Sequence, residues 1–442
     1  MPSQYHHSIR FDAERCDGCM SCMRACPTGA VRVRRGRAAK LADRCIDCGE
    51  CIRVCPRSAI VPLTDQMDDL SKFDYTVAIP SPALYSQFDV DTPPGVIVAA
   101  LKQCGFNDVE CLSPACDAVT TATEMFLDSY RGQFPLISSF CPTVVRLVQV
   151  KYPELVDQLL PILAPREISA RAAKERKSKE CGIPQERIGA VYITPCPGKV
   201  VSMLEHPGME RSYLDTAVSI SDLFPTLSAA VARVGDGEPD LSRGETASGI
   251  SWTYMGRLPR SLPAENTLPI SGLRNVMRIL DDVEKGRLRK YVFIECHACA
   301  EGCVGGCLTV ENPYVARGKA IKLSQRLPSG PAIDRDTVAR SYREGAYFMD
   351  EPLASRPLRP LADDIASAIV KMKERERILA SLPGIDCGAC GAPSCRAFAE
   401  DVVLDEAEQA LCVFSWQREV FERINDLARL VSLQRPADGG KR

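Results

Sequence analysis

Two runs of cysteines near the start of the chain share one spacing. Each reads C-x2-C-x2-C-x3-C followed by proline, and the runs comprise Cys16, Cys19, Cys22 and Cys26, then Cys45, Cys48, Cys51 and Cys55. A cubane cluster needs four thiolates, and this spacing supplies three from one tight loop and the fourth from a distant residue. Zinc is the alternative metal for Cys-x2-Cys pairs. The doubled spacing nevertheless indicates two 4Fe–4S clusters rather than zinc.

Where such runs are doubled, the fourth cysteine of each run ligates the cluster of the other run. The predicted ligand sets are therefore Cys16, Cys19, Cys22 with Cys55, and Cys45, Cys48, Cys51 with Cys26. Between the runs, VRVRRGRAAKL alternates and contains Gly36, which predicts a hairpin. We predict a two-cluster ferredoxin domain over residues 1–65, and its function would be electron relay between nearby clusters.

A third cysteine group lies near the end of the chain, with spacing C-x2-C-x4-C-x16-C: Cys387, Cys390, Cys395 and Cys412. It resembles the small four-cysteine cluster domain of Rnf-type electron-transport subunits and of corrinoid iron–sulfur proteins, including the CGACG turn. The resemblance implies one 4Fe–4S cluster in a small, mainly α domain over residues 364–430, in which CRAFAEDVV is a helix. Zinc is again the alternative.

The middle of the chain, residues 74–347, alternates between two kinds of segment. YTVAIPS, FPLISSF, IGAVYITPC and KYVFIECHAC are apolar and strand-like, whereas PPGVIVAALKQCGF, DAVTTATEMFLDSY and SGLRNVMRILDDVEKG have helical periodicity. Such alternation predicts an α/β domain with buried parallel strands. Ligands of these folds gather beyond the carboxyl ends of strands. Three cysteine-bearing loops are expected there: those of Cys141, of Cys196, and the loop after Glu295.

These three loops, SSFCPTVVRLV, ITPCPGKVV and ECHACAEGCVGG, resemble the three-loop signature of the iron-only (FeFe) hydrogenase catalytic domain. AIPSPALYSQF also resembles the loop of that family over its diiron centre. The resemblance implies a two-lobed α/β domain with a 4Fe–4S cluster on Cys141, Cys196, Cys299 and Cys303. It also implies that Cys303 bridges to a diiron subsite with carbonyl and cyanide ligands, and that Lys199 donates a hydrogen bond to a cyanide. Dedicated maturation enzymes would have to install that subsite.

The chain departs from the family pattern where protons are carried. The family's proton-carrying cysteine corresponds to Phe140, and its glutamate beyond the lysine corresponds to Ser202, with Glu205 one helical turn further. Since phenylalanine carries no proton, fast proton delivery is not expected. These departures resemble the divergent, sensory or accessory branch of the family.

The second and third loops also differ from the family. Thr194 and His297 replace the two methionines, and Cys296 and Cys307 are additional cysteines. A histidine in this loop can serve as a ligand or proton carrier near neutral pH, so His297 joins Lys199 as a candidate catalytic residue. The alternative is a histidine that only hydrogen-bonds to the backbone. We predict a slow hydrogenase or a hydrogen or redox sensor that works with a ferredoxin-type or signalling partner.

An alternative is that the third loop binds a cluster by itself, through Cys296, Cys299, Cys303 and Cys307. Cys141 and Cys196 would then be ordinary buried thiols, and the chain would be a pure electron-transfer subunit without a diiron site. Four further cysteines lack ligand spacing and are expected to be buried: Cys104, Cys111, Cys116 and Cys181.

Composition excludes several other classes. The 55 basic and 57 acidic residues nearly balance and no long basic block occurs, so no nucleic-acid partner is expected. No apolar run approaches the roughly 18 residues of a membrane span. MPSQYHHSIR lacks the apolar core of a secretory signal, so we expect the 22 cysteines to act as thiolates in a reducing cytoplasm. RAAKERKSKE is expected to be a solvated helix face, and RPADGGKR a disordered tail.

Overall fold

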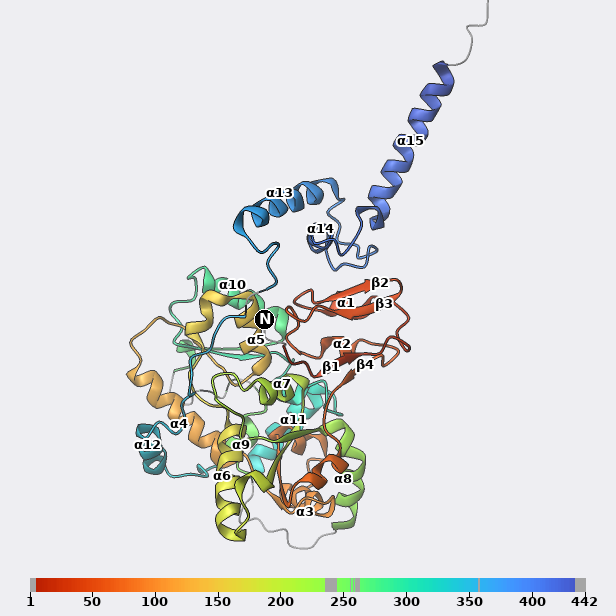
Figure 1. The fold of residues 1–442 in the computed structure, drawn as a ribbon. Helices are drawn as coiled ribbons and strands as arrows, with labels where there is room; N and C mark the ends of the chain where they lie inside the picture. The colour runs from red at the N-terminus through yellow and green to blue at the C-terminus, as the bar shows by residue number, and fades with distance from the viewer. Residues whose placement is uncertain are drawn as a thin grey trace, which may run out of the picture. The chain divides into compact units, whose positions relative to one another are not determined.

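A computed structural model of the chain describes residues 5–234, 245–254, 256, 258, 263–356 and 358–433 (Figure 1). The predicted tail, residues 435–442, lies outside them. The described residues form two compact units. One comprises the described residues within 1–10, 45–53 and 61–356, and the other comprises those within 11–44, 54–60 and 357–442. The predicted domain boundaries at 1–65, 74–347 and 364–430 stay a prediction.

The first unit contains a four-stranded parallel sheet in the order β6-β5-β8-β9. Its strands are β5 (Tyr75–Pro80), β6 (Asp108–Val109), β8 (Ile188–Thr194) and β9 (Thr216–Ser219). Every residue of β8 is buried, as expected for a strand covered on both faces. Ala78 and Val191 pack towards α3 (Pro94–Gln103) and α8 (Ile220–Val234), which lie side by side (Figure 1). The opposite face packs on α6 (Pro165–Cys181).

A second parallel sheet in the same unit has the order β10-β11-β7. Its strands are β7 (Leu136–Ile137), β10 (Thr267–Ser271) and β11 (Phe293–His297). Ile137 and Ile294 pack on α5 (Pro142–Lys151) and α10 (Leu273–Glu284), whereas Leu136 and Phe293 face the cluster that contains α4 (Ser113–Ser129). The predicted strands and helices are present, and the predicted α/β class is confirmed.

The internal repeat near the N-terminus is visible as two short helices, α1 (Ser21–Ala25) and α2 (Glu50–Arg53). The predicted hairpin is confirmed: β2 (Val31–Arg34) pairs antiparallel with β3 (Arg37–Lys40), and Gly36 turns the chain with φ +72°. β1 (Ile9–Phe11) and β4 (Ile60–Pro62) form a two-stranded sheet.

The C-terminal region is helical, as predicted. It comprises α13 (Ile365–Ser381), α14 (Cys395–Val403) and α15 (Val413–Leu433). The predicted helix CRAFAEDVV is α14, and the side chain of Ser394 caps it by accepting a hydrogen bond from the Ala397 amide at 3.1 Å. The other α-helices are α7 (Pro197–Glu205), α9 (Ala247–Ser251), α11 (Pro313–Arg326) and α12 (Arg335–Arg343). No helix in the described ranges is both long and apolar enough to cross a membrane.

The expectation of a solvated helix face was wrong, and the expectation of buried cysteines was correct only in part. RAAKERKSKE lies in α6, but Lys174 and Lys177 are buried, since they pair with Asp215 at 2.7 Å and Asp108 at 2.7 Å beside the first sheet. Of the four cysteines without ligand spacing, Cys111 and Cys116 are buried, Cys104 is half-buried, and Cys181 is exposed. Cys181 is the last residue of α6.

Candidate metal centres

One small cavity of the second unit brings together the first predicted ligand set, Cys16, Cys19, Cys22 and Cys55. Burial and the neighbouring Cys16 and Cys19 raise the pKa of the Cys22 thiol to about 11. Backbone amides point at two of the sulfurs: Ala38 donates to Cys16 at 3.4 Å, and Ala59 donates to Cys55 at 3.2 Å. Four converging thiols with amide donors fit a thiolate-bound cubane, whose reduction potential such hydrogen bonds tune.

The second run has the same local structure. Cys51 lies in α2 as Cys22 lies in α1, and the Ala30 amide donates to Cys26 at 3.2 Å, as Ala59 does to Cys55. Cys45, Cys48 and Cys51 belong to the first unit and Cys26 to the second, so this ligand set stays a prediction.

A buried cavity in the first unit is lined by Cys141, Cys196, Cys299 and Cys303. Cys141 follows β7, Cys196 follows β8, and the other two follow β11, as expected for the carboxyl ends of parallel strands. Cys141 and Cys196 are each the N-cap of a helix that begins with proline. Proline suits the first helical position because its backbone φ is fixed near the helical value. The helix dipole there favours a thiolate.

The electrostatics of this cavity fit a metal cluster. Burial and the neighbouring sulfurs raise the pKa of Cys141 to about 11, and burial raises the pKa values of Cys196 and Cys299. Without a metal, thiols with such raised pKa values would stay protonated in the cavity. Iron would bind these sulfurs as thiolates, because metal binding displaces the protons. Cys303 differs: burial opposes its ionisation, but Lys199 and His297 outweigh burial and lower its pKa to about 6.

Lys199 and His297 both contact Cys303. The Lys199 ammonium lies 3.6 Å from the Cys303 sulfur and donates to the Tyr192 hydroxyl at 3.0 Å. His297 Nε2 lies 2.9 Å from Glu295 Oε1, and burial opposes the histidine charge, but Cys303 and Glu295 raise the pKa of His297 to about 10. The second oxygen of Glu295 accepts from the Gly256 and Leu258 amides at 3.0 and 3.3 Å. Both predicted catalytic side chains therefore face the same sulfur.

The position expected to carry protons is part of an apolar wall. Phe140 packs against Trp252 with ring centroids 5.0 Å apart, and both rings line the cavity. Ser202 accepts from Arg166 at 3.0 Å. Glu205 lies in a different depression of the surface, where its carboxylate pairs with Arg146 at 2.7 Å and with Arg356 at 2.5 Å.

The two additional cysteines of the third loop are separated in space. Cys296 is buried in the core of the second sheet and also borders the cavity. Cys307 lies against the loop of the second run, where a Cβ on Gly49 would come 2.1 Å from its sulfur. Burial raises the pKa of Cys307 to about 12. The four cysteines of this loop thus do not all line the cavity that Cys141 and Cys196 share with Cys299 and Cys303.

Sequence reasoning missed three groups around this site. Tyr192 accepts the hydrogen bond of Lys199, Arg166 lines the cavity, and Arg53 of α2 donates to the Gly305 carbonyl oxygen. Arg53 is distant from Gly305 in sequence, so no local pattern could pair them. The alternation of β8 predicts that Tyr192 lies on the same face of the sheet as Ala190. It does not predict that the Tyr192 hydroxyl contacts Lys199.

Comparisons with known proteins agree with this architecture. Residues 74–248 and 261–307, about half of the chain, match the family described as iron only hydrogenase large subunit, C-terminal domain. Residues 8–56 match a 4Fe-4S dicluster domain, and residues 382–414 match a family described as putative Fe-S cluster.

Two curated relatives are similar at low identity. Iron hydrogenase 1 of Clostridium pasteurianum is 26% identical over 264 residues, which are 50% of this chain and 46% of the relative. The NADP-reducing hydrogenase subunit HndD of Solidesulfovibrio fructosivorans is 28% identical over 320 residues, 59% of this chain and 54% of the relative. The chain thus spans about half the length of the curated relatives it matches.

Among solved structures, the [FeFe]-hydrogenase HydA1 from Chlamydomonas reinhardtii shares the fold. It has a TM-score of 0.51 and 14% identity, and the match covers 66% of this chain and 97% of HydA1. The predicted resemblance is confirmed by the family match, which spans the strands and loops that carry Cys141, Cys196, Cys299 and Cys303. This chain belongs to the iron-only hydrogenase large-subunit family and carries iron–sulfur cluster domains on both sides of the hydrogenase-like domain.

Proposed function

We propose that this chain relays electrons through 4Fe–4S clusters to a hydrogenase-type centre that reacts slowly with hydrogen or senses it. The observation that carries the proposal is the position of Lys199. Its ammonium lies 3.6 Å from the sulfur of Cys303, inside the cavity that the four predicted cysteine ligands line.

Lys199 is suited to holding an anionic ligand beside the cluster. It is buried, and burial disfavours its charge, but Cys303 and its other neighbours raise the pKa of the ammonium. An ammonium has three N–H donors, and the contacts to Tyr192 and Cys303 use two of them. The third donor can serve a small anion in a dry pocket, where charge-assisted hydrogen bonds are strong.

When bound, a diiron subsite would supply the metal atoms at which hydrogen is formed or split. The residues of this chain would bind that subsite, exclude water from it and move protons only slowly. Phe140 and Trp252 present aromatic rings to the cavity and offer no group there that exchanges a proton with it. His297 contacts Cys303 and pairs with Glu295, so these two residues are the proposed route for the proton.

The relay is supported by contacts within the first unit. Cys48, a predicted ligand of the second N-terminal cluster, lines the same cavity as Cys141 and Cys196. The adjacent Gly49 packs against Cys307, and Arg53 donates to the Gly305 carbonyl oxygen in the third loop. A cluster on the second run would therefore sit beside the hydrogenase-type centre, which favours electron exchange between them.

A second candidate is an electron-transfer subunit whose middle domain holds a cubane and no diiron site. The aromatic wall at Phe140 favours it, because a subsite without a fast proton route has little use as a catalyst. In either case the chain would need a redox partner, of the ferredoxin type or a signalling protein, and the diiron form would also need maturation enzymes.

Infrared spectroscopy separates the two candidates. The full chain is produced anaerobically together with diiron-site maturation enzymes, and its iron and sulfide are counted. Iron-bound carbonyl and cyanide bands that respond to hydrogen gas are the expected result. Complete cubane iron without such bands would support the electron-transfer subunit instead.

A further inference from the structure

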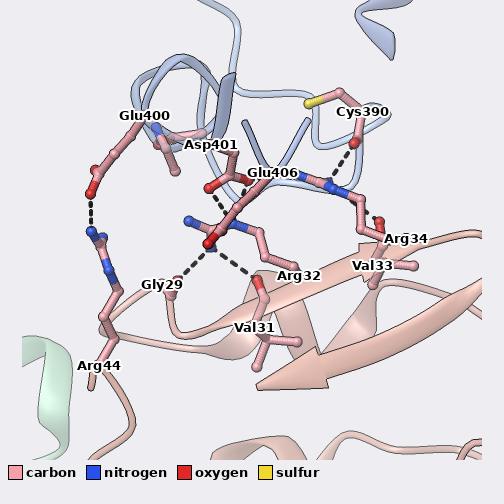
Figure 2. Close-up of polar contacts among 12 residues, drawn as sticks. Gly29, Val31, Arg32, Val33, Arg34, Arg44, Cys390, Glu400, Asp401 and Glu406 are labelled. Atoms are coloured by element: carbon pink, nitrogen blue, oxygen red, sulfur yellow. Dashed lines mark hydrogen bonds and ion pairs between the residues drawn. The ribbon is translucent and has the colours of Figure 1, made fainter. Parts of the chain in front are cut away.

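The β2–β3 hairpin and the C-terminal cysteine region belong to the same compact unit and are joined by a buried ion pair. Arg32 of β2 donates from Nε to both carboxylate oxygens of Asp401 in α14, at 2.7 and 3.0 Å. Arg34 pairs with the same carboxylate (Figure 2). The side chains of Arg32 and Asp401 are only 5% and 3% exposed, so water screens this pair little. We call Arg32, Arg34 and Asp401 the latch.

Backbone contacts extend the latch to the cysteine turn itself. The Val33 amide donates to the Gly391 carbonyl oxygen at 2.9 Å, and Arg34 Nη1 donates to the Cys390 carbonyl oxygen at 2.7 Å (Figure 2). Gly391 has φ +79°, and a Cβ there would lie 1.8 Å from the Val33 oxygen. Only glycine permits this approach, so the CGACG turn is built to lie against β2. Arg44, which follows the hairpin in the sequence, forms another ion pair with Glu400 of α14.

A second line of contact joins the predicted ligands of two clusters. Met23 follows Cys22, is 1% exposed, and its Cε lies 2.9 Å from where a Cβ on Gly388 would be. Gly388 in turn follows Cys387. Cys22 and Cys387 are therefore connected through their chain neighbours, because the Met23 side chain is in van der Waals contact with Gly388. The predicted ligands at its two ends belong to the N-terminal set of Cys16, Cys19, Cys22 and Cys55 and to the C-terminal set.

A buried ion pair is weak evidence for added stability, because desolvation offsets its attraction. Such pairs can instead fix one register of packing. Here two guanidinium groups and one carboxylate, together with two backbone contacts, hold the C-terminal turn in one position on the hairpin. The position held in this way is the one that places Met23 against Gly388.

We propose that the latch docks the C-terminal cluster onto the hairpin so that it exchanges electrons directly with the N-terminal cluster on Cys16, Cys19, Cys22 and Cys55. This inference rests on the proposed function, in that both cysteine sets bind 4Fe–4S clusters. A low-potential one-electron donor, such as a reduced ferredoxin-type protein, reduces the C-terminal cluster at its exposed Cys387. One electron then leaves that cluster and reduces the N-terminal cluster, and no bond or proton changes place.

The test is electron paramagnetic resonance of the dithionite-reduced full chain, with iron and sulfide counted in each sample. Two reduced clusters in close contact broaden each other's signals and relax faster. The wild type should show this coupling. Cys390→Ser, which removes a C-terminal ligand, should lose the part of the broadening that the C-terminal cluster causes, while the coupling between the two N-terminal clusters remains. Asp401→Asn should keep the iron of the wild type but lose most of that added broadening. The matched control is Glu419→Gln, which removes an exposed carboxylate of α15 that pairs with Arg423 of the same helix.

Several results would overturn the inference. The first is a wild type that contains its full iron but whose signals are no broader than those of Cys390→Ser. That result would mean that both clusters are present but not coupled. Asp401→Asn could keep the coupling intact, which would remove the role of the latch. If Asp401→Asn does not fold, Arg34→Met is measured in its place, because Arg34 is 25% exposed and its loss disturbs the interior less. Iron too low for a C-terminal cluster would also refute the proposed function of that cysteine group, and the iron count alone reveals that case.

Discussion

The ammonium nitrogen of Lys199 lies 3.6 Å from the sulfur of Cys303, and this contact explains why one thiol of the cavity differs from the others. Burial raises the pKa values of Cys141, Cys196 and Cys299, whereas the charge of Lys199 is the main cause that lowers the pKa of Cys303 to about 6. Cys303 is therefore the sulfur best able to remain a thiolate while it is bound on more than one side. Lys199 lies in α7, which follows β8, and Cys303 lies in the loop after β11, so the pairing depends on both sheets.

Replacing Lys199 tests this contact. Lys199→Met keeps the length of the side chain but removes the ammonium donor for Cys303 and for an anionic ligand. We expect the cubane iron to be retained and the carbonyl and cyanide bands to be lost or shifted after maturation. Lys319→Met is the control, because Lys319 pairs with Glu311 outside the cavity. Unchanged bands in Lys199→Met would contradict the assigned role.

Restoring a proton carrier at position 140 should increase hydrogen turnover. Phe140→Cys places a thiol in the cavity wall, and a positioned proton-transfer group typically contributes about 100-fold or more. We expect a rise of at least about tenfold in hydrogen-dependent dye reduction by the matured protein. Phe140→Ala is the matched control, since it opens the same space beside Trp252 without adding a proton carrier. Equal rates for the two variants would indicate that access, rather than proton transfer, is limiting.

Local pattern was enough to predict most of the fold. The alternation of apolar strands and periodic helices predicted an α/β domain with parallel strands, and the predicted hairpin and α14 are present. The placement of cysteines at strand ends followed from a general rule of open α/β sheets. These features depend on residues that are close together in the sequence, so the sequence alone could reveal them.

Contacts between distant segments could not be predicted in this way. Arg32 and Asp401 are 369 residues apart, and nothing near either residue indicates the other. Lys174 and Lys177 look solvated in a charged run, but α6 covers a sheet whose edges carry Asp108 and Asp215. A charged residue is buried where a partner from elsewhere compensates its charge, and one sequence does not name that partner.

The pair between Lys177 and Asp108 predicts a pH-dependent contribution to stability. Burial opposes the charge of Asp108, but Lys177 at 2.7 Å and Lys102 at 3.0 Å lower its pKa to about 2. Because the folded-state pKa lies below the ordinary value of 3.8, the stabilisation is present above pH 3.8 and is lost as the pH falls towards 2. Asp108→Asn should lower the free energy of unfolding by about 2 kcal/mol at pH 7.

The measurement is the urea midpoint followed by circular dichroism at pH 7 and at pH 5, anaerobically. Both pH values lie above the range in which Asp108 titrates, so the difference from the wild type should be the same at both. Asp91→Asn is the control, because Asp91 is exposed and pairs with the exposed Arg326. A midpoint equal to that of the wild type would show that the buried pair adds nothing to stability.

Iron counting on single cysteine variants decides which sulfurs hold the middle cluster. If the cavity set is correct, Cys141→Ser loses the middle cubane, because Cys141 lines the cavity with Cys196, Cys299 and Cys303. Cys307→Ser should keep it, since the Cys307 sulfur packs against Gly49 instead. The alternative of a cluster held by the third loop alone predicts the reverse: iron retained in Cys141→Ser and lost in Cys307→Ser. Cys111→Ser serves as the control for removing a buried thiol, because Cys111 lies in the loop before α4 and does not border the cavity.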